Sequence, residues 1–326
     1  MIPKFVRGSI APVFTAFHED GRLDDEGQRS ILSWLAGTKA ISAFFVRSGM
    51  GQMFSFSYDD VRQIAKTACG LRAGNVPVLM GCSGIWDRDH DKYPDPQVYM
   101  QQAVDLSKYA EDLGAGGVVH TLPEAIQPKS GQKIDDVIMK YFETICAAVK
   151  LPVFIYQSPG TDERYILSIE LVRRLADIPN LAGMKASTND AHYIFNITYA
   201  VRDKDFGFIS GAETAFLAGL ISGSRAVIGQ GASVNPRILN AIQTRYEKGD
   251  IKGACEAQWS TNLLVLRSKN TTEFFKRYIS EKGYKVKPCA RVTGSPYSTT
   301  SARLSQEEYD TYKDLLESEL EKYASG

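Results

Sequence analysis

The sequence predicts an α/β protein, a (β/α)8 TIM barrel with a C-terminal helical extension. Eight short apolar runs recur between residues 10 and 228, with helical patterns between them. Most of the runs do not alternate in polarity, as expected for parallel strands covered on both faces. After Pro236 the strand signals stop and only helical patterns follow.

The eight predicted strands are Ile10–Phe14, Ile41–Val46, Val78–Met80, Gly117–His120, Val153–Tyr156, Ala182–Lys185, Phe206–Ile209 and Ala226–Ile228. Strands that alternate with helices fit either a doubly wound sheet or a closed barrel. A count of eight favours the barrel. No Gly-x-Gly-x-x-Gly turn follows the first strand to indicate a dinucleotide-binding sheet.

Capping residues mark the starts of several predicted helices. The sequence Ser57-Tyr58-Asp59-Asp60 is a variant capping box that opens a helix over Val61–Cys69. Ser168 can cap a helix over Ile169–Ala176. The expected C-terminal helices are Arg237–Glu247, Ile251–Ser268, Thr271–Tyr278 and one from a capping box at Ser305 to about Tyr323, with a polar loop over Tyr284–Thr300. We expect residues 1–236 to form a catalytic barrel domain and residues 237–326 a helical region.

The composition argues against several classes of function. The 326 residues carry 38 basic and 38 acidic side chains, so no overall field favours nucleic acid or an anionic membrane. Five scattered cysteines include no Cys-x-x-Cys pair, which disfavours a disulfide framework and a zinc site. No signal-peptide core is visible, and no run approaches about 18 apolar residues. We expect a soluble, cytoplasmic protein with no nucleic-acid or membrane partner and no bound metal.

Lys185 is the most informative residue, because it closes the apolar run Leu181-Ala182-Gly183-Met184-Lys185. Burial disfavours the charged form of a lysine and can lower its pKa by several units. An uncharged amine in a partly apolar pocket can attack a ketone and form a Schiff base. The plainer interpretation is a lysine that emerges into solvent or pairs with a carboxylate.

The other candidates also lie at predicted strand ends, where TIM barrels carry their functional groups. Tyr156 ends the strand before that of Lys185, so we expect the phenol and the amine within hydrogen-bonding reach. The turn Ser48–Gly51 can present backbone N–H groups to a carboxylate. The plainer alternatives are a packed tyrosine, an ordinary tight turn and, for Glu213, a carboxylate favoured by a helix N-terminus. For His120, a structural role is the favoured interpretation.

Four segments carry a resemblance to a known family: Ala11-Pro12-Val13-Phe14-Thr15-Ala16-Phe17, Ser48-Gly49-Met50-Gly51-Gln52, Tyr156-Gln157-Ser158-Pro159 and Gly183-Met184-Lys185-Ala186-Ser187. With these segments in the expected strand positions, the chain resembles the dihydrodipicolinate synthase / N-acetylneuraminate lyase superfamily of Schiff-base aldolases. The resemblance runs from about Gly8 to Pro236, with a compatible helical C-terminal region.

The resemblance implies that Lys185 forms an imine with pyruvate or another 2-oxo acid, without a cofactor, and that Tyr156 shuttles protons. It implies that Ser48, Gly49 and Met50 hold the carboxylate of the 2-oxo acid, near Thr15. The remaining substrate-binding residues that it implies are Gly211, Glu213, Ile228 and Gln230. Relatives are commonly tetramers built from tight dimers, so a homo-oligomer is expected.

Three departures from the family pattern narrow the expected function. Gly49 and Met50 replace two hydroxyl residues of the turn, so carboxylate binding would rest on backbone N–H groups and Ser48, with Arg47 as a candidate helper. Ala125 stands where a dihydrodipicolinate synthase has a tyrosine, and Gly160-Thr161 where it has an arginine. Loss of a guanidinium removes a bidentate grip on a carboxylate. A dihydrodipicolinate synthase activity is therefore disfavoured.

We expect a class I aldolase or lyase that cleaves a 2-oxo-3-deoxy sugar acid, or a related hydroxy 2-oxo acid, to pyruvate and an aldehyde. One alternative is a dehydratase or hydratase-aldolase that uses the same imine. Another is a barrel that binds a 2-oxo acid without turnover, which the altered turn suggests. The segment Gly84–Gln97 is expected to narrow the pocket entrance or to extend an interface.

Overall fold

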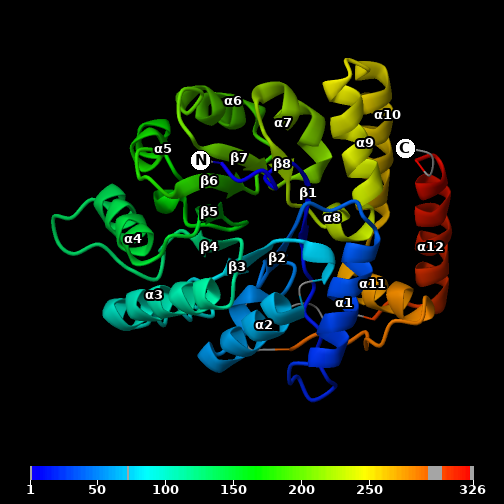
Figure 1. The fold of residues 1–326 in the computed structure, drawn as a ribbon, viewed down its shortest axis with the longest axis horizontal. Helices are drawn as coiled ribbons and strands as arrows, with labels where there is room; N and C mark the ends of the chain where they lie inside the picture. The colour runs from blue at the N-terminus through cyan, green and yellow to red at the C-terminus, as the bar shows by residue number, and fades with distance from the viewer. Residues whose placement is uncertain (1, 72, 293–302, 324–326) are drawn as a thin grey trace.

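The computed structural model describes residues 2–71, 73–292 and 303–323, and these fold as a closed barrel of eight parallel strands. The strands follow one another around the barrel in chain order, and β8 pairs with β1 to close it. Helices surround the barrel, and a further group of helices lies at one side, next to β1 (Figure 1). The predicted TIM barrel with C-terminal helices is therefore confirmed.

Each predicted strand is present, and its ends differ from the prediction by at most two residues. The strands are β1 Gly8–Pro12, β2 Ala43–Val46, β3 Val78–Gly81, β4 Gly117–Thr121, β5 Val153–Gln157, β6 Leu181–Ala186, β7 Gly207–Ser210 and β8 Ala226–Val227. The largest difference is β1, which lies two residues earlier than predicted because the apolar run continues beyond the paired residues.

Two apolar cores hold the barrel together. The smaller core fills the barrel interior and takes at least one side chain from every strand, among them Ile10, Phe45, Leu79, Phe154 and Ile209. The larger core lies between the outer faces of the strands and the surrounding helices. Both faces of each strand are therefore apolar, which explains why the strand sequences show no polar alternation.

The α-helices are α1 Asp25–Gly37, α2 Tyr58–Leu71, α3 Pro96–Asp112, α4 Ile134–Ala148, α5 Ile169–Leu175, α6 Ala191–Ala200, α7 Phe216–Ser222, α8 Gly231–Val234, α9 Pro236–Glu247, α10 Ile251–Arg267, α11 Thr271–Glu281 and α12 Gln306–Glu321. Short 3-10 helices are η1 Met53–Ser55, η2 Ala73–Asn75, η3 Glu163–Tyr165 and η4 Glu213–Ala215.

The predicted helix caps are present. Ser57 Oγ accepts from the N–H of Asp60, and the Asp60 carboxylate accepts from the N–H of Ser57. Ser168 caps α5 through the N–H of Leu171. Ser305 forms a full capping box at the start of α12. These reciprocal bonds satisfy backbone donors that the first helical turn leaves free.

The C-terminal helices pack directly on the barrel and reach its mouth. Helix α9 contacts β1 and α7, α10 packs along α9, and α12 packs against α10 (Figure 1). Helix α10 also contacts η4, which follows β7 at the C-terminal end of the barrel. The predicted loop is present over residues 284–292, and its remainder lies outside the described residues. The division into a barrel domain and a helical region stays a prediction, since the two share this packing.

In the part of the chain that the structure describes, no helix combines the length and the apolar character needed to cross a membrane.

Gly183 in β6 provides a test of the barrel packing. A Cβ at this position would overlap the backbone carbonyl of Gly207 on β7, which has no flexible side chain to move aside. We expect Gly183→Ala to lower the free energy of unfolding by about 1–3 kcal/mol or more, measured by denaturant unfolding. Gly70 in α2 is the matched control, because a Cβ added at this position would meet no atom within 4 Å. Gly70→Ala should be neutral or stabilising by up to about 1 kcal/mol. Equal stability of Gly183→Ala and the wild type would contradict this account.

Candidate active site

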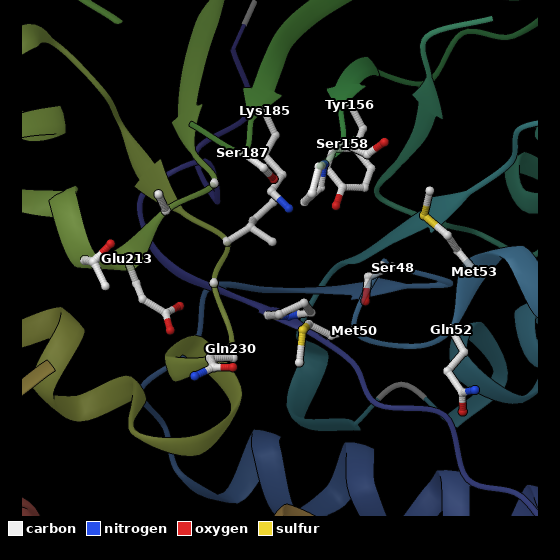
Figure 2. A pocket seen from close by; sticks show the side chains of 18 of the residues that line it. Ser48, Met50, Gln52, Met53, Tyr156, Ser158, Lys185, Ser187, Glu213 and Gln230 are labelled. Carbon is white, nitrogen blue, oxygen red and sulfur yellow. The ribbon is translucent and has the colours of Figure 1, made fainter. Parts of the chain in front are cut away.

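A cavity of about 440 Å³ opens at the C-terminal ends of the strands. Its described lining includes Pro12, Ser48, Gly49, Met50, Gln52, Met53, Phe54, Tyr156, Ser158, Pro159, Lys185, Ser187, Gly211, Ala212, Glu213, Thr214, Ile228, Gly229, Gln230 and Val265. All the predicted site residues except Thr15 belong to this lining. Figure 2 shows the strand-end residues on one side of the cavity and the turn after β2 on the other.

Lys185 and Tyr156 lie side by side at the base of the cavity. They are register partners on the adjacent strands β5 and β6, and both are at least 93% buried. The Lys185 Nζ atom lies 4.0 Å from the centroid of the Tyr156 ring. The amine thus lies over the ring of Tyr156, and no hydrogen bond between the amine and the phenol is found among the described residues. Burial excludes the alternative that Lys185 emerges into solvent, and among the described residues it forms no ion pair within 4.0 Å.

The turn after β2 is held in an uncommon conformation. Arg47 and Gln52, at either end of the turn, have φ values of 54° and 62°. The N–H of Gly51 donates to Ser48 O over 3.0 Å, and the N–H of Met53 donates to the same oxygen. Among the described residues, no acceptor is recorded for the N–H groups of Gly49 and Met50, which both line the cavity. Two backbone donors are therefore available to a ligand.

Glycine at position 49 makes room for the phenol. A Cβ there would lie 3.0 Å from the Tyr156 hydroxyl, closer than such atoms normally approach. A side chain at position 49, such as the hydroxyl residue of the family pattern, would crowd the Tyr156 hydroxyl. Glycine at this position therefore permits the observed placement of Tyr156. The phenol oxygen lies next to the turn that offers the free N–H groups.

Thr15 and Arg47 are placed behind the cavity wall. Thr15 is buried, and its Oγ1 donates to Gly51 O over 2.7 Å. This hydrogen bond holds the turn from the barrel side. The Arg47 guanidinium donates to backbone carbonyls of the loop after β3, including Ser83 O at 2.6 Å. Burial lowers the pKa of Arg47. Arg47 is not in the described lining of the cavity, so the structure gives no contact for its suggested part in carboxylate binding.

Glu213 lies across the cavity from the turn. Its Oε2 accepts from the N–H of Gly231 over 3.0 Å, and the side chain is buried. A Cβ at Gly229 would overlap this carboxylate, so any larger residue there would have to displace the Glu213 side chain. Burial raises the pKa of Glu213 to about 7, although the Gly231 N–H and the charge of Lys185 act in the opposite direction. The carboxyl can thus exchange a proton near neutral pH.

Gln230 is fixed by the C-terminal helices. Its Nε2 donates to Ser268 Oγ and its Oε1 accepts from Thr271 Oγ1, each over 3.1 Å. Gln258 of α10 donates to the backbone carbonyl of Glu213 over 2.8 Å. The junction of α10 and α11 therefore sets part of the cavity wall.

Sequence reasoning missed three hydroxyl residues of the lining, namely Ser158, Ser187 and Thr214. A signal for two of them was present, because Ser158 and Ser187 each follow a strand-end residue by two positions within the segments that carry the family resemblance. Thr214 follows Glu213 directly. Together with Glu213 and Gln230, they add polar groups to the lining, with Ser158 and Ser187 beside Tyr156 and Lys185 (Figure 2).

His120 has the structural role that was favoured for it. It is fully buried between the barrel and its outer helices, where its two ring nitrogens contact Ser107 Oγ and Tyr141 Oη at 3.0 and 2.9 Å. Burial lowers the pKa of His120 to about 3. Among the described residues, no group of three or more His, Cys, Asp or Glu side chains is arranged to hold a metal ion.

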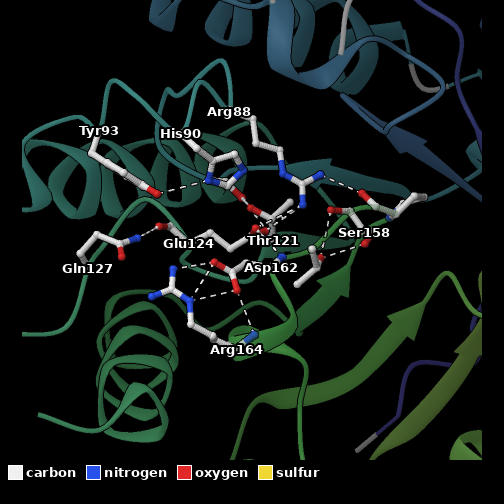
Figure 3. A network of polar contacts seen from close by, with 12 residues as sticks. Arg88, His90, Tyr93, Thr121, Glu124, Gln127, Ser158, Asp162 and Arg164 are labelled. Carbon is white, nitrogen blue, oxygen red and sulfur yellow. Dashed lines mark hydrogen bonds and ion pairs between the residues drawn. The ribbon is translucent and has the colours of Figure 1, made fainter. Parts of the chain in front are cut away.

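Arg88 fastens the segment 84–97 to the loops around the cavity (Figure 3). Its guanidinium is buried and contacts both carboxylate oxygens of Glu124 at 3.2 Å. It also donates to Pro159 O over 2.8 Å and lies 5.3 Å from the centre of the Phe54 ring. Pro159 and Phe54 line the cavity, so this segment acts on the wall through Arg88. Narrowing of the entrance and extension of an interface both stay predictions.

Comparison with known proteins agrees with this geometry. The family model described as the dihydrodipicolinate synthetase family matches residues 5–317. The chain belongs to this family. A protein named as a DapA-like lyase is among the relatives of the chain, and the protein is accordingly an enzyme of this family. The superfamily suggested by the sequence motifs is thereby confirmed.

The chain is similar to curated relatives and to solved structures. A 4-hydroxy-tetrahydrodipicolinate synthase from Nitrosospira multiformis is 28% identical over 249 residues, which cover 76% of each chain. The N-acetylneuraminate lyase from Mycoplasma synoviae has a TM-score of 0.77 at 20% identity, over 97% of this chain and 98% of the other. A prophage protein of the dihydrodipicolinic acid synthase family from E. coli K12, solved with pyruvate, has a TM-score of 0.77 at 22% identity, over 96% and 98%. The structural matches show a shared fold.

The raised pKa of Glu213 predicts a pH-dependent contribution to stability. The folded protein holds the acid in its neutral form up to about pH 7, whereas the pKa of this carboxyl in an unfolded chain has its ordinary value of 4.5. The stabilisation of the wild type relative to Glu213→Gln should therefore be fully present below about pH 4.5. It should fall by on the order of a few kcal/mol as the pH rises through 7. Denaturant unfolding of both proteins from pH 4.5 to 8 measures this difference.

The matched control is Glu143→Gln, which changes an exposed carboxylate on α4. Its stability should run parallel to the wild type over the same range. A constant difference between the wild type and Glu213→Gln across this range would contradict the assignment.

The Arg88–Glu124 pair predicts a second effect on stability. Removal of one partner leaves a buried charge without its counter-charge, so Glu124→Gln should cost about 3–5 kcal/mol in denaturant unfolding. The double variant Arg88→Met/Glu124→Leu should recover much of this loss, since neither charge remains. Arg164→Met is the control, because the Arg164–Asp162 pair beside it is largely exposed on the arginine side, and little change is expected. A double variant less stable than Glu124→Gln would argue against this electrostatic explanation.

Proposed function

We propose that the protein is a pyruvate-releasing Schiff-base aldolase that cleaves a 2-oxo-3-deoxy sugar acid or a related hydroxy 2-oxo acid. The observation that carries this proposal is the placement of a buried lysine amine 4.0 Å from the ring of Tyr156, in a cavity with two free backbone donors. A buried amine beside a phenol suits imine chemistry, which requires proton transfers at the carbonyl carbon.

The proposed reaction starts when the Lys185 amine adds to the ketone of the substrate. The Tyr156 phenol donates its proton to the departing hydroxyl, so that loss of water gives a protonated imine, which can accept an electron pair, and leaves Tyr156 as a phenolate. The bond between the carbons α and β to the imine then breaks, as Tyr156 takes the proton of the β-hydroxyl and the aldehyde leaves. Tyr156 returns the proton to the α-carbon of the enamine. Hydrolysis consumes one water, releases pyruvate, restores the amine and returns the remaining proton to the Tyr156 phenolate.

The turn is the proposed site for the carboxylate of the 2-oxo acid. The N–H groups of Gly49 and Met50 lack a recorded acceptor among the described residues, and Ser48 adds a hydroxyl. Backbone donors arranged in this way bind anions without a charged side chain. Thr15 would act indirectly by holding Gly51. The likeness to a family member solved with pyruvate supports this assignment.

The opposite wall is the proposed site for the hydroxylated part of the substrate. It carries Glu213, Gln230 and Thr214, and the hydroxyls of Ser158 and Ser187 lie at the strand ends beside Tyr156 and Lys185 (Figure 2). Gly211, whose Cβ would collide with Ala186 O, and Ile228 shape the space between them. The described lining contains no arginine, so a second carboxylate would find no guanidinium there. This supports a sugar acid over the amino acid substrate of a dihydrodipicolinate synthase.

A cytoplasmic location and a dimeric or tetrameric assembly are also proposed.

The test is covalent trapping. We expect pyruvate with borohydride to leave a stable adduct on Lys185, detected by peptide mass spectrometry, and Lys185→Arg to leave none. Tyr156→Phe should keep the fold but lower kcat for cleavage by about 10²–10⁴, the usual contribution of a positioned proton-transfer group. Absence of any adduct on the wild-type lysine would refute the proposal.

Product analysis separates the alternatives that share the imine. A panel of 2-oxo-3-deoxy acids should yield pyruvate in equal amount to the aldehyde. Formation of a deoxygenated oxo acid without pyruvate would indicate a dehydratase. Tight binding with trapping but no turnover across the panel would indicate a binding protein.

A further inference from the structure

The side-chain amide of Gln52 is paired with the backbone of Arg291, far away in sequence. Gln52 Nε2 donates to Arg291 O over 2.6 Å, and the N–H of Arg291 donates to Gln52 Oε1 over 3.2 Å. Gln52 ends the turn after β2 and lines the cavity. Residues 284–292, here called the clamp segment, therefore contact the cavity wall directly.

The pairing acts at a point of unusual backbone geometry. Gln52 is in the left-handed region at φ 62°, which few residues other than glycine adopt. Its carbonyl accepts from Ser55 Oγ over 2.9 Å, at the end of η1. A residue in this conformation needs its surroundings to keep it there. The bidentate contact with Arg291 is one such support.

The clamp segment is itself firmly anchored. The Arg291 guanidinium donates to Gly21 O and Ser55 O, and it pairs with the Asp60 carboxylate at the start of α2. Its central carbon lies 4.8 Å from the centre of the Phe17 ring. The buried Lys276 amine of α11 donates to the Cys289 carbonyl. The segment is thereby fixed to the loop after β1, to α2 and to α11.

We propose that the clamp segment sets the position of the turn at residues 48–52, and that Gln52 and Arg291 are positioning residues for 2-oxo acid binding. Thr15 supports Gly51 from the barrel side, and Gln52 ties the next residue to the clamp segment on the outer side. The free N–H groups of Gly49 and Met50 lie between Ser48 and these supports. Small displacements of hydrogen-bond donors weaken binding strongly. This inference rests on the proposed function, in which the turn holds the carboxylate.

The experiment measures the pyruvate concentration that gives half-maximal borohydride trapping on Lys185. Gln52→Ala removes the amide, and Arg291→Ala loosens the segment. We expect half-saturation to rise about tenfold in Gln52→Ala, as for the loss of one hydrogen bond, and to rise in Arg291→Ala as well. The trapping rate at saturating pyruvate should stay within about twofold, because Lys185 and Tyr156 are not displaced. The double variant should match the larger single effect, since both changes break one link.

Two further variants distinguish positioning from general stability. Lys287 also lies in the clamp segment, where it forms an exposed ion pair with Glu19. Lys287→Ala removes this pair and should keep the wild-type pyruvate concentration for half-maximal trapping. Gln52→Gly accepts the left-handed backbone without strain but lacks the amide, so it should behave like Gln52→Ala. Wild-type half-saturation in Gln52→Gly would overturn the proposal. So would a rise in Lys287→Ala equal to that in Arg291→Ala.

The two levels of proposal fail in different ways. If wild-type Lys185 forms no adduct, the proposed function is wrong. If the wild type forms the adduct and the folded Gln52 and Arg291 variants bind pyruvate equally well, only the clamp inference is wrong. Thermal melting and circular dichroism establish that the variants compared are folded.

Discussion

The register between β5 and β6 is the constraint on which the site depends. It pairs Tyr156 with Lys185 and so places the phenol ring beside the amine. Closure of the barrel then places the turn after β2 across the interior from this pair, so that in the proposed reaction a ligand on the lysine would meet backbone donors on the other side. A shift of one residue would turn Lys185 from the interior to the helix-covered face, because successive side chains of a strand point in opposite directions. The chemistry is thus decided by strand pairing before any loop is considered.

Around this pair, glycines leave space for functional side chains, and hydrogen bonds to distant segments fix other polar side chains in place. Gly49 leaves space for the phenol oxygen and Gly229 leaves space for the Glu213 carboxylate. The C-terminal helices fix Gln230, and the clamp segment fixes Gln52. The helical extension is therefore part of the cavity wall, and its packing against β1 and η4 explains how it reaches there.

Much of this arrangement could be predicted from the sequence because the signals are local. Eight compact apolar runs gave the barrel strands, and strand-end positions identified Lys185 and Tyr156 without any tertiary information. The capping boxes at Ser57 and Ser305 depend on residues three positions apart and were equally visible. Contacts between distant segments could not be read in this way. The pairing of Gln52 with Arg291 and of Arg88 with Glu124 joins residues 239 and 36 positions apart. The placement of Thr15 behind the turn, and of Arg47 away from the cavity, likewise follows from packing in three dimensions.

The close fit of Gly229 against Glu213 has a consequence for how members of this fold diverge. Any side chain at 229 would have to displace the acid, and a shorter residue at 213 would leave an empty space beside the glycine. Neither position can change alone without a penalty, so an altered preference for the distal part of the substrate should arise through paired replacements. A library that randomises both codons together would reach such variants, whereas one that varies a single codon at a time would discard each of them as defective.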